Sequence, residues 1–147
     1  FPTRRSSDLT MEEFIDSIEL LLPFKAEYVS VARLTVSAIA HRMGFDIETI
    51  EDIKVALSEV CTKLVKIGSK TASKYRIIFN IYKDVLNIVF DCEDKSLMCI
   101  FNDEMDELAV QIINTFMDTA ELCTHENNYI LSMSKSIGEK VDNATET

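Results

Sequence analysis

The sequence predicts a two-layer α/β sandwich, in which helices cover one face of a mixed, mostly antiparallel sheet. Its 147 residues are enough for one domain with a hydrophobic core. Residues 27–43 and 50–68 repeat apolar side chains at helical spacing, whereas residues 74–82 and 85–91 alternate as strands do. With the remaining elements the order becomes β-α-α-β-β-α-β-β, which is typical of this class.

In the first half of the chain a strand precedes two helices. Residues 14–22 are rich in apolar side chains and predict a strand that packs across the sheet or pairs with another subunit. The helix at 27–43 ends at Gly44, a residue typical of helix C-termini, and Asp46 is the expected N-cap of the next helix. The apolar stripe of the first helix is expected to be Tyr28, Ala32, Val36, Ile39 and Met43.

In the second half, the strands 74–82 and 85–91 are joined by a tight turn. Residues 97–101 are expected to form a further short strand, and 104–117 a third helix. The inward residues of that helix are expected to be Leu108, Ile112, Thr115 and Phe116. The last two strands are predicted as a hairpin of residues 120–124 and 129–134.

The two ends of the chain are set apart from this domain. Residues 1–9, FPTRRSSDL, can be encoded by the end of a widely used sequencing adapter, so we expect residues 1–10 to be an artefact outside the fold. A basic N-terminal arm is the alternative. We expect a single domain over residues 11–137 and a polar, frayed tail over residues 138–147.

The composition excludes several classes of function. A net charge of −10 leaves no basic surface for DNA or RNA. The apolar runs are too short to cross a bilayer and no secretory signal is visible, so we expect a cytoplasmic protein that binds no membrane. The four cysteines have no CxxC spacing and only two histidines accompany them. We therefore expect no metal site, and reduced thiols at Cys61, Cys92, Cys99 and Cys123.

Two helical stretches resemble the anti-sigma serine kinases, which hold stress and sporulation sigma factors inactive in Gram-positive bacteria. A helix of that family reads D-L-K-I-A-V-S-E-A-C-T-N-A-V-x-H, and residues 52–67 here read D-I-K-V-A-L-S-E-V-C-T-K-L-V-K-I. Residues 27–46 resemble the family's first helix over nearly its whole length. The resemblance implies the histidine-kinase-like fold of the ATPase superfamily that includes gyrase and Hsp90. We also expect a homodimer.

The resemblance implies an ATP site, but this chain has only part of it. Glu59 stands at the position of the family's general base, and Lys63 replaces the asparagine that binds magnesium. Asp91 or Cys92 aligns with the aspartate of the adenine loop, and the family's glycine-rich phosphate stretch corresponds to 106–111, DELAVQ. Side chains here occupy positions where phosphate would approach bare backbone. We therefore expect neither ATP nor magnesium to bind, and kinase activity to be lost.

The positions at the nucleotide site also have a plainer interpretation. Glu59 and Lys63 are four residues apart on a helix and would form an exposed ion pair worth about 0.3–0.5 kcal/mol. The acidic run at 103–107 either repels phosphate or provides favourable charges at a helix N-terminus.

A partner-binding face is expected on the first helix. Arg33 matches the arginine with which the family contacts sigma factors and anti-anti-sigma proteins, and arginine is a common interface anchor. Ser30 and Ser37 flank it one turn away on each side and are small enough to admit a partner. A merely solvated face is the alternative.

Three hypotheses about function remain. The preferred one is an anti-sigma protein that binds a sigma factor, an anti-anti-sigma (STAS) protein or both, without ATP. The second is an active ATP-dependent serine kinase, in which Lys63 contacts phosphate in place of the metal. The third is a structural dimerisation module with no sigma partner.

Overall fold

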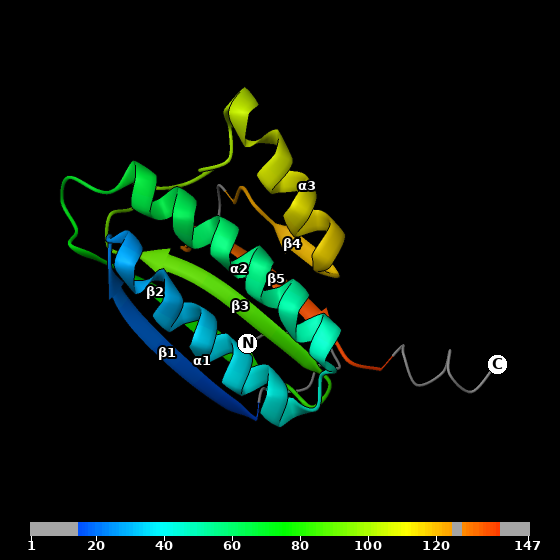
Figure 1. Ribbon diagram of the computed structural model, residues 1–147. Coiled ribbons are helices and arrows are strands. Elements are labelled where there is room, and N and C mark those ends of the chain that lie inside the picture. The colour runs from blue at the N-terminus through cyan, green and yellow to red at the C-terminus, as the bar shows by residue number, and fades with distance from the viewer. Residues whose placement is uncertain (1–14, 125–127, 139–147) are drawn as a thin grey trace.

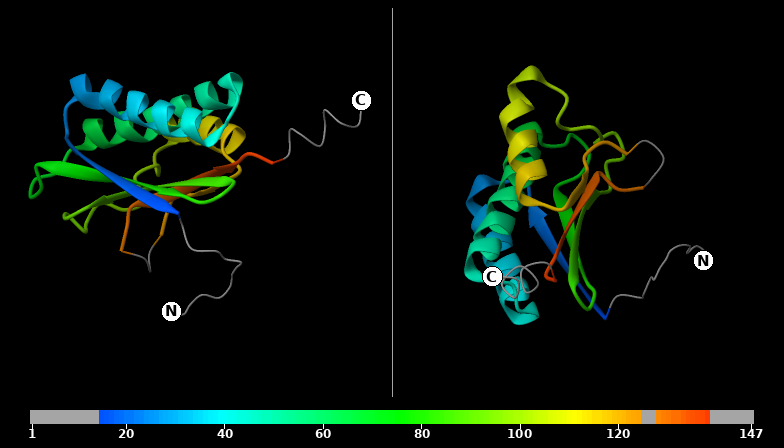
Figure 2. Two further views of the ribbon diagram at one scale, coloured as in Figure 1. Left: turned by 90° about the horizontal axis from the view of Figure 1, so that it is seen from below. Right: turned by 90° about the vertical axis from the view of Figure 1, so that its right-hand side faces the viewer.

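A computed structural model describes residues 15–124 and 128–138. Five strands form one sheet in the order β1-β2-β3-β5-β4, and the helices lie together on one of its faces (Figures 1 and 2). All four pairings among these strands are antiparallel, so the parallel component of the predicted mixed sheet is not found in the described residues. The predicted two-layer α/β sandwich is confirmed. Residues 1–10 and the tail beyond Gly138 lie outside the described part.

Most predicted elements are present, with shifted ends. The strands are β1 Asp16–Pro23, β2 Lys74–Ile81, β3 Val85–Cys92, β4 Thr119–Glu121 and β5 Leu131–Ser136. The helices are α1 Val29–Met43, α2 Ile47–Ile67 and α3 Glu107–Phe116, and the short 3-10 helices η1 Ala26–Tyr28 and η2 Glu104–Asp106 precede α1 and α3. None of the helices in the described residues is long and apolar enough to cross a membrane.

The strand predicted at 97–101 is wrong. This segment has no regular secondary structure and belongs to the long connection between β3 and η2. Ile100 is only 4% exposed and packs into the core, as an isolated anchor rather than as one residue of a paired strand. A short apolar run can be either a strand or a buried loop, and the sequence pattern does not distinguish the two. The prediction of a strand failed for this reason.

The sheet buries one face under the helices, as the alternating pattern predicts. Phe79, Ile88 and Phe90 have no exposed surface and contribute to the core. β1 is an edge strand that pairs with β2 of its own chain rather than packing across the sheet, and its pairing with another subunit stays a prediction. Ile18 and Leu21 of β1 remain 40% and 51% exposed.

The junction between α1 and α2 is fixed by two local signals that the sequence predicts. Gly44 follows α1 with φ of 102°, a left-handed conformation that suits glycine. The carboxylate of Asp46 accepts a hydrogen bond of 2.8 Å from the backbone N–H of Thr49 and caps α2. The buried stripe of α1 includes Ala32 and Val36 as expected, but Tyr28 is 37% exposed because it belongs to η1.

Removing the cap is a direct test of this junction. Asp46→Ala is expected to lower the free energy of unfolding by about 0.5–2 kcal/mol, because a backbone donor at the start of α2 loses its acceptor. Asp46→Asn is the matched control, since its side-chain oxygen can still accept that bond. Urea unfolding of both variants measures the difference, and equal losses would show that the cap contributes nothing.

The third helix matches its predicted inward side only in part: Ile112 and Phe116 are half-buried, and Phe116 packs against the core. Ile113 and Met117 are buried, whereas Leu108 is 68% exposed and Thr115 is also exposed. The apolar residues of α3 form one broad side of the helix, so its spacing allows more than one row of residues on that side to be inward. Packing against α2 selects the face that contains Ile113.

Candidate functional site

Lys63 lies near the C-terminal end of α2, and its side chain contacts η2 just before α3. Its Nζ lies 2.9 Å from Oδ1 of Asp106, and the two side chains are only 16% and 11% exposed. The predicted pair between Lys63 and Glu59 is therefore wrong. Glu59 is half-buried, and no hydrogen bond or ion pair joins it to another residue within 15–124 and 128–138.

Asp106 is held in place from two sides. Its Oδ2 accepts a hydrogen bond of 3.1 Å from the backbone N–H of Asp103, and the carboxylate of Asp103 caps the start of η2 in return. The hydrogen bond from Lys63, above all, holds the pKa of Asp106 below its usual range. The acidic run at 103–107 was predicted either to repel phosphate or to place favourable charges at a helix N-terminus. The structure shows the second role, because Asp103 caps η2. The same run also supplies the carboxylate that pairs with Lys63.

Asp91 and Cys92 lie on opposite faces of β3 because side chains alternate along a strand. Asp91 is on the face away from the helices, where its carboxylate lies 3.2 Å from Nζ of Lys95 and 3.7 Å from Nη1 of Arg76. Cys92 is 3% exposed among the core residues, and its thiol donates to the backbone carbonyl of Lys74 at 3.5 Å. Of the two candidate adenine positions, Cys92 is the one that faces the helical layer.

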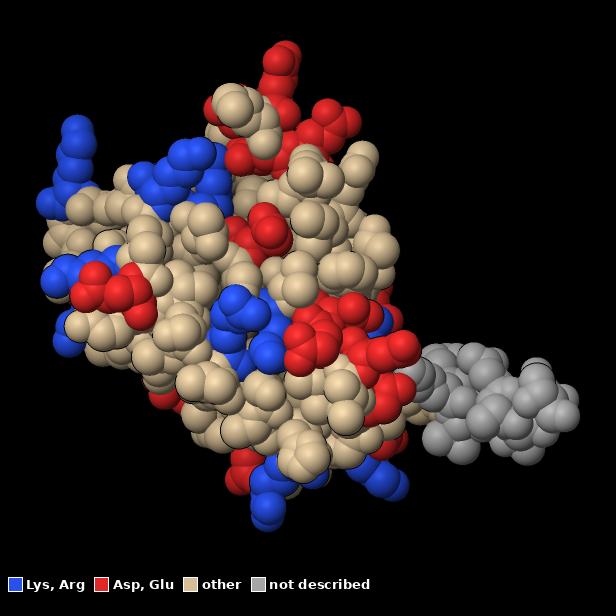
Figure 3. Space-filling model, viewed as in Figure 1, with Lys and Arg blue, Asp and Glu red and all other residues tan. Residues whose placement is uncertain are grey.

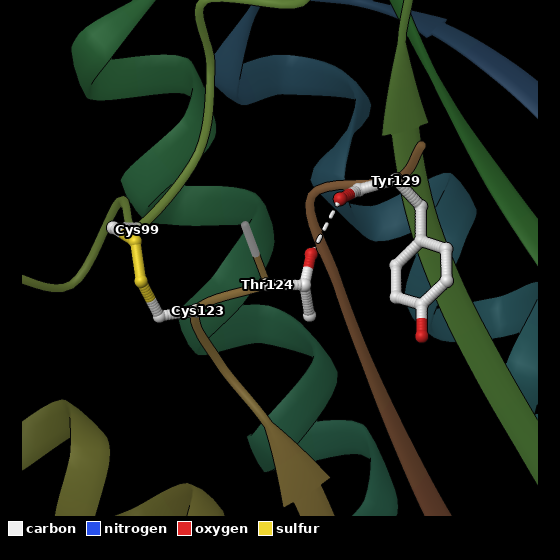
Figure 4. Close-up of a disulfide and its surroundings, with 4 residues drawn as sticks. All are labelled: Cys99, Cys123, Thr124 and Tyr129. Carbon is white, nitrogen blue, oxygen red and sulfur yellow. Dashed lines mark hydrogen bonds between the residues drawn. A yellow bond between two sulfur atoms is a disulfide. The ribbon is translucent and has the colours of Figure 1, made fainter. Parts of the chain in front are cut away.

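Two of the cysteines depart from the prediction of reduced thiols. Cys99 and Cys123 form a disulfide between residues 24 positions apart, whereas Cys61 and Cys92 are free and buried (Figure 4). No spacing motif signals this pair, because folding alone brings the connection after β3 beside the end of β4. Among the residues described, no three or more His, Cys, Asp or Glu side chains are grouped as metal ligands would be.

The predicted partner face lies on the outer side of α1. Ser30 and Arg33 are exposed and Ser37 is half-buried. Beside them Leu34 is 69% exposed, and Ile47 at the start of α2 is 76% exposed. These two apolar side chains border a groove of about 380 Å³ between α1 and α2, which Ser37, Ala38, His41 and Ile50 also line.

The charges around this face are unevenly distributed. Figure 3 shows basic side chains in the middle of the helical face, with acidic side chains over the N-terminal half of α2 beside them. A second acidic group covers the start of the α3 region, at the opposite end of the same face. The outer side of α1 therefore combines the guanidinium of Arg33, the exposed side chains of Leu34 and Ile47, and the groove that these two side chains border.

Comparisons with known proteins agree with this architecture. The profile of the family described as "Histidine kinase-like ATPase domain" matches residues 22–135. The chain is 34% identical to the Serine-protein kinase RsbW of Bacillus cereus (strain B4264), over 90% of this chain and 93% of that protein. The proteins of the same name from Bacillus thuringiensis subsp. konkukian (strain 97-27) and Bacillus anthracis (strain CDC 684 / NRRL 3495) are 34% and 33% identical, with the same coverage. The chain therefore belongs to the histidine kinase-like ATPase family, in the anti-sigma serine kinase group that its two helices resemble.

Proposed function

We propose that this chain is an anti-sigma regulatory protein that binds its partner in the cytoplasm through the outer face of α1 and does not use ATP. The partner is a sigma factor, an anti-anti-sigma (STAS) protein, or each in turn. The observation that carries the absence of ATP use is the ion pair between Lys63 and Asp106; partner binding rests on the family and on the exposed face of α1. Lys63 stands at the position of the family's magnesium-binding asparagine, and Asp106 is the first residue of the stretch that corresponds to the family's phosphate-binding glycines.

This ion pair leaves little in the site for magnesium or phosphate to bind. A protonated lysine has three donors and no acceptor, so Lys63 cannot coordinate a metal ion. Asp106 is a carboxylate within the stretch that would contact phosphate, and like charges repel. At the adenine position facing the helices, Cys92 offers a buried thiol in place of a carboxylate acceptor. The residues present do not fit the Mg-ATP complex.

The second candidate, an active serine kinase, is supported by the name of the curated relatives. In that hypothesis Lys63 would contact phosphate directly, and phosphate would have to displace Asp106 from the lysine. Glu59 would then be the general base, and it stands at the family's position for that role. A titration with nucleotide separates the two candidates.

We expect no saturable binding when Mg-ATP is titrated into the full chain by calorimetry up to millimolar concentrations. The Bacillus cereus relative is the positive control, because it is named a serine-protein kinase. Lys63→Asn is not expected to restore binding, since the side chains of 106–111 remain in the phosphate stretch. Magnesium-dependent binding by the unmodified chain in the micromolar range would favour the kinase.

A homodimer is part of the proposal. β1 is an edge strand; Ile15, directly before it, is 64% exposed, and Ile18 and Leu21 within it are 40% and 51% exposed. Unpaired backbone groups and apolar side chains on an edge strand favour association with a second chain. If the chain dimerises but binds neither sigma factor nor STAS protein, the third hypothesis of a dimerisation module replaces the first.

A further inference from the structure

The disulfide between Cys99 and Cys123 fastens the connection that precedes η2 to the end of β4. Cys123 follows β4 and is exposed, and Cys99 lies within the connection and is half-buried (Figure 4). The residue after Cys123 is anchored, because Thr124 is 4% exposed and donates a hydrogen bond of 2.9 Å to the backbone carbonyl of Tyr129. The chain directly after Cys123 is therefore held in place.

The remaining two thiols are in a contrasting environment. Cys61 has no exposed surface, and burial raises the pKa of its thiol to about 12. Cys92 is 3% exposed and engaged with the carbonyl of Lys74. Because thiol exchange requires a thiolate and access to the sulfur, neither is suited to react. Reactivity toward thiols in the described residues is thus concentrated at the disulfide, whose Cys123 is exposed.

The backbone at Cys99 adds a second observation. Its φ is 49°, and it is the only residue other than glycine with a positive φ in the described part of the chain. This left-handed conformation is unfavourable for a residue with a Cβ, so surrounding contacts must hold it. Ile100 is buried beside it, and the bond to Cys123 provides the other restraint.

We propose that Cys99 and Cys123 form a reversible thiol–disulfide site that a dithiol reductant opens. A thiolate of the reductant attacks the sulfur of Cys123, the more exposed of the two residues, and the bond to Cys99 breaks. Cys99 leaves as a thiolate and takes a proton from water. The second thiol of the reductant then displaces Cys123 from the mixed disulfide. The protein gains two electrons and two protons, and the dithiol becomes a disulfide.

Opening this bond would release the middle of the connection. At its start, the carboxylate of Asp94 accepts a hydrogen bond of 2.6 Å from the hydroxyl of Ser69. At its end, Asp106 is paired with Lys63 at 2.9 Å. The disulfide lies between these two attachments, so its reduction leaves the segment between them held by Ile100 and noncovalent contacts alone. This inference does not depend on the proposed function.

Alkylation of the folded full chain tests the chemistry. The air-oxidised protein, treated with iodoacetamide and analysed by mass spectrometry, is expected to take up no label. After dithiothreitol it is expected to take up two labels, at Cys99 and Cys123, while Cys61 and Cys92 stay unlabelled until the protein is denatured. Oxidised glutathione should restore the unlabelled state. Label on the air-oxidised protein, or none after dithiothreitol, would overturn the proposal.

Hydrogen exchange tests whether the site controls the connection. Amide exchange over residues 95–106 is expected to be several-fold faster after reduction, while α1 is unchanged. The variant carrying both Cys99→Ser and Cys123→Ser should exchange like the reduced protein and should not respond to dithiothreitol. Equal exchange in the oxidised and reduced protein would show that the bond opens without releasing the segment, and would refute its role as a switch.

Discussion

Replacing Arg33 by alanine is expected to weaken binding to the partner sigma factor by roughly 5- to 150-fold, equivalent to about 1–3 kcal/mol. The guanidinium is exposed on α1, beside Leu34 and the groove that reaches Ile47. An exposed arginine contributes little to folding, but it can form two parallel hydrogen bonds to a partner carboxylate. The melting temperature of Arg33→Ala should therefore equal that of the unmodified chain.

A binding titration with the purified sigma factor, run beside a thermal melt of each variant, measures this effect. Arg42→Ala is the matched control, since Arg42 is also exposed on α1 but lies in its last turn. Arg33→Lys keeps the charge but removes the fork of donors, so an intermediate loss would indicate bidentate recognition. Unchanged affinity in folded Arg33→Ala would place the interface elsewhere, and a large fall in melting temperature would make Arg33 structural.

Replacing Lys63 by methionine is expected to lower the melting temperature by several degrees at neutral pH. The change leaves the carboxylate of Asp106, which is only 11% exposed, without its cation. The sequence alone predicts a small effect, because it places Lys63 in an exposed pair with Glu59. The structure reverses that expectation.

The loss should depend on pH in a defined direction. Lys63 lowers the pKa of Asp106 in the folded chain, so the pair stabilises the fold above the usual pKa of an aspartate. That contribution disappears as the pH falls through the lowered pKa of the folded state, where Asp106 becomes protonated. The difference in melting temperature between the unmodified chain and Lys63→Met should therefore be largest near neutrality and shrink in acid.

Thermal melts between pH 7 and pH 3 test both expectations. Lys54→Met is the control, because Lys54 lies on the same helix and pairs at 3.1 Å with Glu51, whose side chain is 58% exposed. Such an exposed pair contributes less than about 1 kcal/mol. Asp106→Asn, alone and combined with Lys63→Met, completes a double-mutant cycle. If Lys63→Met behaves like Lys54→Met at every pH, the pair has no special role.

The sequence by itself determined the features that depend on near neighbours along the chain. The apolar spacing of α2, the alternation in β2 and β3, the glycine after α1 and the cap at Asp46 are all local, and each was predicted. The family was also predicted, because the likeness resides in two continuous helices. Local geometry allows only a few conformations for such segments, so their patterns can be interpreted without the fold.

Only the tertiary structure decided which distant residues meet. Asp106 is 43 positions from Lys63, and Cys123 is 24 positions from Cys99, so neither partner can be found from spacing. The sequence also left undetermined which part of the broad apolar side of α3 faces inward, and packing against α2 decided it. A helix pattern fixes the neighbours of Lys63 within one turn, such as Glu59. The path of the chain after β3 then brings a better-placed carboxylate to the same amine.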